Sequence, residues 1–253
     1  MIRLPNKFKN TSILLPVLDE DISLKKTIQI LINDNRKFIK NIFLIIDKKK
    51  TIKKSQNLCH FFSKRFKIIK IVYQKTPKLG GAFRDAIKYI KSSHCIIMCS
   101  DLETDPKTVR KLIIQSRRSP NYIIQASRWI GKNNFYNYGI IKVVMNFFFQ
   151  KIFSFLFRVN CSDLTFGFRI LPTILLKSFK WEMNDHSFVF ESNLKPIISG
   201  TKIRTIKTKW KKRIEGEGHN QIFNYYKYLF IGIKLFVKYK MFTSFRNNEK
   251  IYN

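Results

Sequence analysis

The chain has 253 residues, and its 45% apolar and 15% aromatic content can bury the core of one large domain, which excludes a disordered protein. The 49 basic and 16 acidic residues give a formal charge of +33. This charge predicts anionic partners, namely nucleic acid, an anionic membrane or phosphorylated substrates, although an AT-rich genome's bias toward Lys, Ile, Asn and Phe contributes to it.

Strand and helix patterns alternate along the first 130 residues or so. Short apolar runs predict strands at 12–18, 41–46, 67–73, 94–99 and 121–127. Helical patterns lie between them, around Leu24–Ile32, at 53–65, after Gly80 and Gly81, and after Pro106. This alternation predicts an α/β fold with a mostly parallel, doubly wound sheet, whose ligands bind beyond the carboxyl ends of the strands.

The second half of the chain carries longer helical patterns that are rich in aromatic residues. One covers residues 138–158 and another covers 225–240. In the second, Lys227, Lys234 and Lys238 share one helical face, and apolar residues cover much of the rest. This pattern predicts an amphipathic helix in the plane of a membrane surface, with packing on the core as the alternative. For residues 138–158 the two interpretations are equally good.

Several absences bear on the compartment. No uncharged apolar run reaches transmembrane length, and the first residues, MIRLPNKFKN, lack the apolar core of a signal peptide. The four cysteines form no C-x-x-C pair and fit no zinc site, so they are expected to be buried thiols in a reducing compartment. We therefore expect a cytoplasmic protein that is peripheral on the inner face of the membrane.

An acidic loop follows the predicted fourth strand, in the stretch IIMCSDLETDP (96–106). Asp101 and Glu103 stand two residues apart, so both side chains point the same way in an extended segment. Carboxylates at a strand end are typical ligands of a hard divalent cation, Mg²⁺ or Mn²⁺, that also binds phosphate oxygens. Asp105 fits better as a cap of the following helix. Asp47 also ends a predicted strand, where a ligand is expected.

Seven stretches occur in an order that carries a family resemblance: LLPVLDE (14–20), LIID (44–47), KLGGAFRDAIKYI (78–90), IIMCSDLETDP (96–106), ASRW (126–129), DLTFGFRIL (163–171) and WKKRIEGEG (210–218). Over about residues 11–220 the chain resembles a family 2 glycosyltransferase of the GT-A fold, most closely the dolichyl- or polyprenyl-phosphate hexosyltransferases. The resemblance implies a GT-A domain at 1–215 and an amphipathic membrane-surface segment at 216–253.

The resemblance also implies roles for individual residues. Positions that contact the nucleotide, or let it approach, are matched by Pro16, Glu20, Asp47, Gly80 and Gly81. The cation positions are matched by Asp101 and Glu103, and the catalytic positions by Asp101, Arg128 and Arg213. Positions near the acceptor are matched by Asp163, Arg169 and Glu191. Four of these have plainer interpretations: Asp163 and Arg169 could form a structural salt bridge, Arg128 could be one of many surface arginines, and Arg213 could be solvated.

The implied reaction is an inverting, cation-assisted transfer of a hexose from a GDP- or UDP-sugar to a polyprenyl phosphate, as in cell-envelope synthesis. The acceptor phosphate is already anionic and needs no general base, which agrees with the absence of a convincing base in the sequence. An alternative is a family 2 transferase that acts on a sugar hydroxyl, with Asp185 or Glu191 as base. Another is a catalytically weakened relative, because Cys99 stands where the first aspartate of the family's D-x-D motif usually lies. Only the charge points to a nucleic-acid binder, and we expect no nucleic acid partner.

Overall fold

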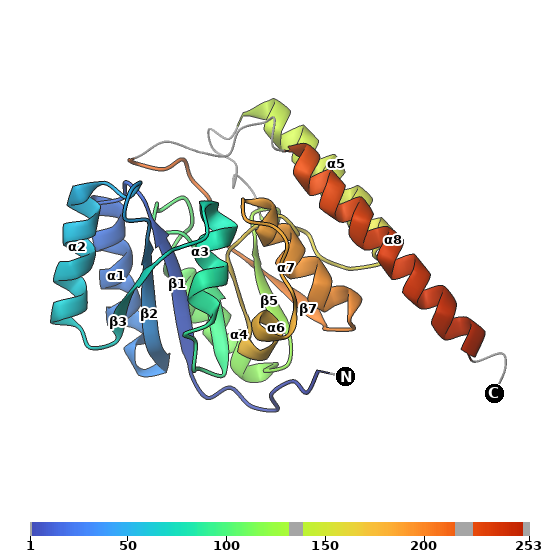
Figure 1. Ribbon diagram of the computed structural model, residues 1–253, viewed down its shortest axis with the longest axis horizontal. Helices are drawn as coiled ribbons and strands as arrows, with labels where there is room; N and C mark the ends of the chain where they lie inside the picture. The colour runs from blue at the N-terminus through green and yellow to red at the C-terminus, as the bar shows by residue number, and fades with distance from the viewer. Residues whose placement is uncertain (1, 132–138, 216–224, 250–253) are drawn as a thin grey trace.

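A seven-stranded mixed sheet forms the centre of the computed structural model, which describes residues 2–131, 139–215 and 225–249 (Figure 1). The strands are β1 (Thr11–Val17), β2 (Ile39–Ile46), β3 (Ile69–Tyr73), β4 (His94–Ile97), β5 (Ile123–Ser127), β6 (Arg169–Pro172) and β7 (Ile203–Lys207). Their order is β3-β2-β1-β4-β6-β5-β7, and only β6 runs antiparallel to its neighbours in this sheet. The predicted α/β fold with a mostly parallel sheet is confirmed.

Helices cover both faces of this sheet. One face carries α1 (Ile22–Asn35), α2 (Lys53–Arg65) and α4 (Thr108–Arg118), and a short 3₁₀ turn, η1 (Arg36–Phe38), follows α1. The other face carries α3 (Lys78–Ile87), α6 (Thr173–Ser178) and α7 (Ser187–Ile198). Successive side chains of a strand point to opposite faces, so Ile13 and Leu15 of β1 pack with the first group and Leu14 with the second.

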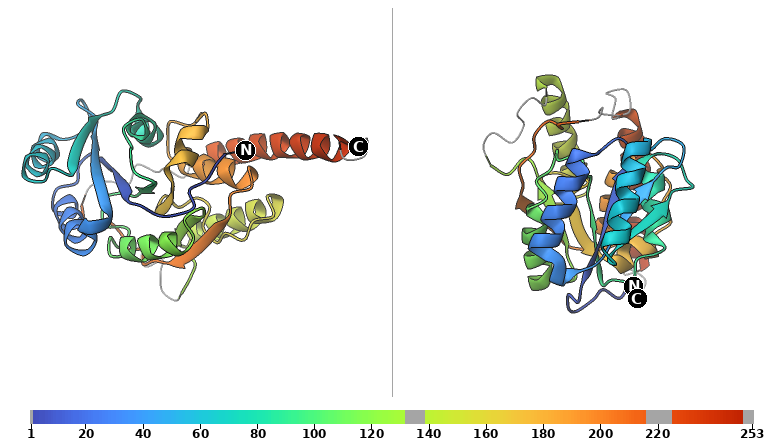
Figure 2. Two further views of the ribbon diagram at one scale, coloured as in Figure 1. Left: turned by 90° about the horizontal axis from the view of Figure 1, so that it is seen from below. Right: turned by 90° about the vertical axis from the view of Figure 1, so that its left-hand side faces the viewer.

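Two further helices, α5 (Ile140–Leu156) and α8 (Tyr225–Glu249), lie beyond the β7 side of the sheet (Figure 1). Figure 2 shows α8 reaching well past the rest of the protein. Phe149 and Phe153 of α5 pack with Tyr228 and Ile231 of α8 in a third apolar cluster, which also includes side chains of α7. One face of α8 therefore belongs to the packed core, as in the alternative interpretation of this segment.

The outward faces of these two helices remain apolar. The exposed side chains, called the apolar ridge below, are Ile140, Ile141, Val144, Met145, Phe147, Phe148, Ile152 and Phe155 on α5, and Tyr226, Leu229, Phe230, Ile233 and Val237 on α8. Ile140 and Phe155 are 83% and 82% exposed, so no other described part of the chain covers them. Among the described residues, no helix combines the length and apolar character needed to cross a bilayer.

The predicted lysine stripe of α8 makes contacts within the protein. Lys227 forms an ion pair with Asp185 at 3.0 Å, and Lys234 forms one with Glu182. Two of the three stripe lysines thus hold α8 against the loop ahead of α7. The predicted domain boundary after residue 215 meets residues 216–224, which lie outside the described residues.

Candidate active site

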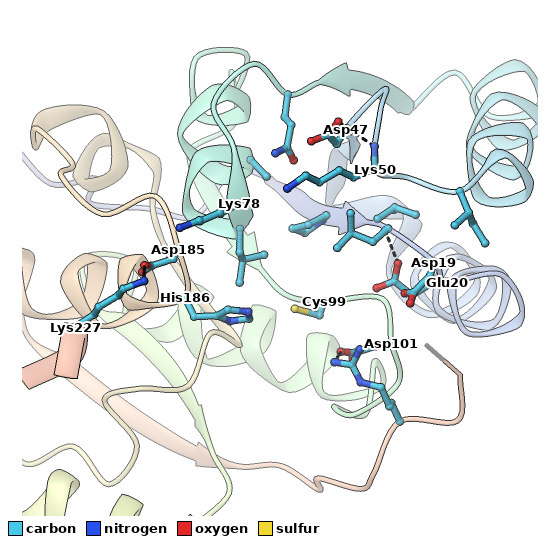
Figure 3. Close-up of a pocket in the computed structure, with 18 residues that line it drawn as sticks. Asp19, Glu20, Asp47, Lys50, Lys78, Cys99, Asp101, Asp185, His186 and Lys227 are labelled. Atoms are coloured by element: carbon cyan, nitrogen blue, oxygen red, sulfur yellow. Dashed lines mark hydrogen bonds and ion pairs between the residues drawn. The ribbon is translucent and has the colours of Figure 1, made fainter. Parts of the chain in front are cut away.

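A cavity of about 560 Å³ opens at the carboxyl ends of β1, β2 and β4 (Figure 3). Parallel strands end at the same edge of a sheet, so the loops that follow them converge there. Five of the predicted site residues line the cavity: Pro16, Glu20, Asp47, Asp101 and Arg213. The structure thus brings together residues from four loops that are far apart in the sequence.

The acidic loop after β4 places the carboxylate of Asp101 at one end of the cavity, beside Arg213. One guanidinium nitrogen of Arg213 lies 3.0 Å from Asp101 Oδ2, and its Nε lies 3.0 Å from Glu103 Oε1. The loop is not extended here, because Leu102 has a left-handed φ of 58° and Asp101 Oδ1 accepts a hydrogen bond from Glu103 N–H at 3.1 Å. The two carboxylates meet at one guanidinium through this turn, not through the expected strand geometry.

Burial controls the titration of this cluster. Removal of Asp101 from water, and then the charge of Glu103, raise the pKa of Asp101 from 3.8 to about 7, although Arg213 opposes the shift. Burial and the neighbouring carboxylates also raise the pKa of the Cys99 thiol well above 9.0. Cys99 is therefore a neutral thiol at physiological pH, and a neutral thiol is a poor ligand for a hard cation.

The donor set fits one kind of cation. Asp101 and Glu103 supply hard oxygens, and the described residues contain no group of three or more His, Cys, Asp or Glu side chains placed to hold a metal. Mg²⁺ and Mn²⁺ are bound in many enzymes by one or two carboxylates, with substrate phosphates and water completing the shell. The two carboxylates fit a cation shared with a phosphate-bearing substrate, and they do not fit an all-protein cage.

Arg213 reaches the acidic loop on a segment that continues from β7. Trp210 forms an isolated antiparallel bridge with Thr104, and Lys211 N–H donates to the Glu103 carbonyl at 3.0 Å. These backbone contacts run the segment alongside the loop that carries Asp101. The plainer interpretation of Arg213, as a solvated residue of the run KWKKR, does not match its position between two carboxylates.

The end of the cavity that holds Asp47 is formed by the loop after β2, whereas Glu20, on the loop after β1, lies near Asp101 and Arg213. Asp47 Oδ1 accepts hydrogen bonds from the N–H groups of Lys49 and Lys50, at 2.9 and 3.2 Å, which folds the lysine run into a tight turn. Glu20 Oε2 accepts from Leu18 N–H at 2.7 Å, and burial raises the pKa of Glu20. Lys50 also lines the cavity, so this end carries both signs of charge.

Gly80 and Gly81 lie in the first turn of α3 rather than among the cavity-lining residues. A Cβ on Gly80 would come within 2.8 Å of Asn184 and Asp185, and one on Gly81 would clash with Thr76. The Gly81 N–H also donates to the Asn184 carbonyl at 2.9 Å. These glycines let α3 approach the loop ahead of α7, which shapes one wall of the cavity.

That wall contains Lys78 and His186, to which the sequence analysis gave no role, beside Asp185 and Lys227, which it named. His186 projects into the cavity across from Cys99, and Asp185, Lys78 and Lys227 lie beside it (Figure 3). Lys78 has a left-handed φ of 68°, a strained conformation for a lysine and one that tends to occur at functional sites. Residue 186 lies 87 residues beyond Cys99 in the sequence, and no spacing or motif signals that the two would meet.

Glu103 contacts Arg213 without lining the cavity, and four further predicted residues lie away from it. Arg128 binds Asp163 through two guanidinium contacts of 2.8 Å, so Asp163 pairs with Arg128 and not with Arg169. Arg169 is fully buried, where it donates to the Phe166 carbonyl at 3.2 Å and to Ser192. Glu191 is also fully buried, and it accepts from the N–H groups of Glu182 and Met183.

Comparisons with known proteins agree with this architecture. The family described as Glycosyl transferase family 2 matches residues 12–178. Among solved structures, glucosyl-3-phosphoglycerate synthase from Mycobacterium tuberculosis with Mn²⁺, uridine diphosphate and phosphoglyceric acid is similar, with a TM-score of 0.62, 12% identity, and coverage of 81% of this chain and 72% of that chain. The same synthase with phosphoglyceric acid gives a TM-score of 0.64 at 12% identity, with coverage of 83% of this chain and 73% of that chain. With Mg²⁺ and uridine diphosphate its TM-score is 0.60 at 12% identity, with coverage of 81% of this chain and 72% of that chain.

At this level of identity the structural likeness shows a common fold. No curated protein sequence matches the chain.

Proposed function

The chain belongs to glycosyl transferase family 2, and from this premise we propose that it moves a hexose from a GDP- or UDP-sugar to a polyprenyl phosphate at a membrane surface. The observation that carries the proposal is the cavity at the strand ends, which Arg213 and Asp101 line, with Glu103 bound to the same guanidinium. Such a cluster suits the diphosphate of a nucleotide sugar, because a cation and a guanidinium can share its charge.

The donor is proposed to lie along the cavity from Asp47 to Asp101. Asp47 stands at the end expected to hold the base, and Pro16 and Glu20 line the side between. The similar synthase is solved with uridine diphosphate and Mn²⁺ or Mg²⁺, which supports a nucleotide donor and a divalent cation here. Asp101 and Glu103 would hold that cation, and it would neutralise charge on the departing diphosphate.

The protein's own residues support the transfer in two ways. Arg213 donates hydrogen bonds into the position of the diphosphate, where negative charge grows as the glycosidic bond breaks. Lys78 and Lys227 place further positive charge on the His186 wall of the cavity. Attack from the side opposite the leaving group inverts the anomeric carbon, and an anionic phosphate acceptor needs no proton removed.

Arg128 is proposed to act on the site only through Asp163. The pair is almost fully buried, with side-chain exposures of 7% and 0%, and neither residue lines the cavity. Asp163, Arg169 and Glu191 likewise support the packing of the acceptor-side wall, with Glu191 holding the loop that carries Asp185 and His186. Gly80 and Gly81 let that wall approach α3.

A lipid-linked acceptor is supported by the apolar ridge of α5 and α8. Lys227 lies in the first turn of α8, lines the cavity and so connects it to a helix whose outer side is apolar. Exposed apolar patches of this kind mark protein or membrane contacts. The ridge would rest on an anionic inner membrane face, aided by the net charge of +33. The segment 216–253 is proposed to serve this contact.

The proposal is tested by incubating the purified protein with membrane lipid extract, Mn²⁺ and radiolabelled GDP- or UDP-hexoses. Label in the organic phase, lost on addition of EDTA, is the expected result. A matched test of docking compares binding to anionic vesicles by the wild type, by Phe155→Ser with Phe230→Ser, and by Phe61→Ser as a control. Phe61 is exposed on α2, away from the ridge. Equal vesicle binding by all three would contradict the membrane assignment.

A second candidate is transfer to a sugar hydroxyl, which the position of Asp185 favours. Asp185 lines the cavity, whereas Glu191 is held by backbone N–H groups outside it. Burial tends to raise the pKa of Asp185, but hydrogen bonds from Ser187 and Lys227 lower it overall, so the carboxylate is ionised at neutral pH. Label only in water-soluble glycan, abolished by Asp185→Asn, would favour this candidate.

A further inference from the structure

Glu215 lies two residues beyond Arg213, and its carboxylate sits at the N-terminus of α1. Its Oε1 accepts hydrogen bonds from Asp21 N–H at 2.9 Å, from Ser23 N–H at 2.6 Å and from the Ser23 hydroxyl at 2.5 Å. Its Oε2 accepts from Ile22 N–H at 3.3 Å. The first N–H groups of a helix have no partner within the helix and form its positive end, so a carboxylate is well stabilised there.

The segment that contains Glu215 is also fixed at its other end. Residues 208–215 are called the strap below. The hydroxyls of Thr208 and Thr108 share a hydrogen bond at 2.9 Å, and Trp210 bridges Thr104. Trp210 is buried in the core cluster of α1, α2 and α4. The strap is therefore anchored on both sides of Arg213.

We propose that Glu215 is a positioning residue, which fastens the strap to α1 and so holds the Arg213 guanidinium beside Asp101 and Glu103. An arginine side chain loses much rotamer freedom when it is held in one place, and a partly exposed ion pair offsets little of that cost. Anchoring the backbone on both sides of Arg213 narrows the positions its side chain can reach. The residue does not touch the cavity, so it acts only through Arg213.

The ionisation of Glu215 agrees with this geometry. Burial raises the pKa of this carboxyl, but hydrogen bonds from Ser23, Asp21 and Ile22 outweigh burial and lower it. The carboxylate is thus charged at neutral pH, as a partner of a helix N-terminus should be.

Hydrogen exchange of the ligand-free protein tests the fastening itself. Glu215→Ala removes the whole contact, and Ser23→Ala removes one of its donors from the α1 side. Asp34→Asn is the control, because Asp34 is an exposed carboxylate on α1 away from the strap. We expect exchange at residues 209–213 to be about tenfold faster in Glu215→Ala, faster by a smaller factor in Ser23→Ala, and unchanged in Asp34→Asn. Unchanged exchange in Glu215→Ala would overturn the proposal.

A double-mutant cycle with Arg213→Ala tests the positioning role, and this part rests on the proposed function. With Arg213 present, Glu215→Ala should weaken binding of UDP or GDP with Mn²⁺ about tenfold, because small misplacements of a positioned group are costly. In the Arg213→Ala background the same change should cost less than about twofold. Equal losses in both backgrounds would show a general structural effect and overturn the positioning role.

Hydrogen exchange tests whether Glu215 fastens the strap, and nucleotide binding tests the proposed function, so failure of one can be told from failure of the other. If wild-type protein binds no nucleotide, the proposed function fails while the exchange result alone decides whether Glu215 fastens the strap. Thermal unfolding of each variant confirms that it is folded before either measurement. Ser23→Ala keeps the test informative if Glu215→Ala does not fold.

Discussion

Two arginine–carboxylate clusters in the described part of the chain differ in charge balance and in access. Arg128 binds one carboxylate, Asp163, through two contacts of 2.8 Å, and its guanidinium lies 4.4 Å from the centre of the Phe166 ring. Arg213 faces two carboxylates, and Glu103 retains 29% of its side-chain exposure. The first cluster is neutral and enclosed, whereas the second carries an excess negative charge at the edge of a cavity.

This difference separates a structural pair from a candidate reactive one. A neutral buried pair satisfies its own charges, so its main effect is on folding. An unbalanced cluster raises the pKa of Asp101 and leaves a need for positive charge that a divalent cation would meet. Both arginines match basic positions of the family resemblance, and only the fold distinguishes their surroundings.

The largest effect is expected from breaking the enclosed cluster. Arg128→Ala should destabilise the protein by about 3–5 kcal/mol, because it leaves the Asp163 carboxylate buried without its partner. Urea unfolding measures this change. Arg204→Ala, which removes an exposed arginine, is the control. A stable Arg128→Ala protein that had lost transfer would return Arg128 to a direct catalytic role.

A change in the Arg213 cluster should lower activity and leave the stability of the protein intact. Asp101→Asn should lower the rate of hexose transfer about 10²- to 10³-fold, the usual loss when one charge-stabilising group is removed. Its stability should be unchanged or higher, because a buried like-charged pair is relieved. Kinetics and urea unfolding on the same preparation measure both. Transfer within a factor of two of wild type would contradict the assignment of Asp101.

The pH dependence of stability sharpens the comparison further. The folded, metal-free protein keeps the Asp101 proton up to a pKa of about 7, whereas the unfolded chain releases it near 3.8. The folded state therefore binds more protons between these values, and its stability falls as pH rises through this window. The stability advantage of Asp101→Asn over wild type should grow from pH 4 to pH 7. A constant difference would show that Asp101 titrates normally.

The smallest effect is expected at an exposed ion pair, which gives a baseline for both clusters. Lys234 and Glu182 are 49% and 34% exposed, so solvent screens their attraction. Lys234→Ala should cost at most about 1 kcal/mol of stability. Chemical denaturation against wild type measures it, and a loss of 3 kcal/mol or more would show that α8 depends on this contact for its docking.

Local patterns predicted the first half of the fold well. The run NIFLII forms a mostly buried strand and KIIKIVY forms a half-buried one, as predicted, and helix α2 spans the predicted residues 53–65. The strands β6 and β7 were not predicted, because RILP has only four residues and IRTIK is mostly polar, and long-range pairing with β4 and β5 stabilises them. Local propensity carries little information about such strands.

The candidate site was predicted where its residues follow strands. Asp47 and Asp101 end predicted strands, so sheet topology alone brings them to one edge. His186 and Glu215 could not be found in this way, because their neighbours depend on how α7 and the strap cross the sheet. The lysine stripe of α8 predicted a helix in the plane of a membrane surface, yet Lys227 and Lys234 contact acidic residues whose positions only the tertiary structure reveals.

The strap has a consequence for the order in which the site forms during synthesis and folding. Arg213 meets an aspartate 112 residues earlier in the chain, and Glu215 meets the start of α1 194 residues earlier. Contacts between such distant residues form late, because a long loop must close before they stabilise anything. A growing chain can assemble β1, β2 and β4 while it still lacks the arginine that binds Asp101 and Glu103. The last described strand to be made, β7, leads into that arginine, so this charge cluster is completed only in a chain whose sheet has largely formed.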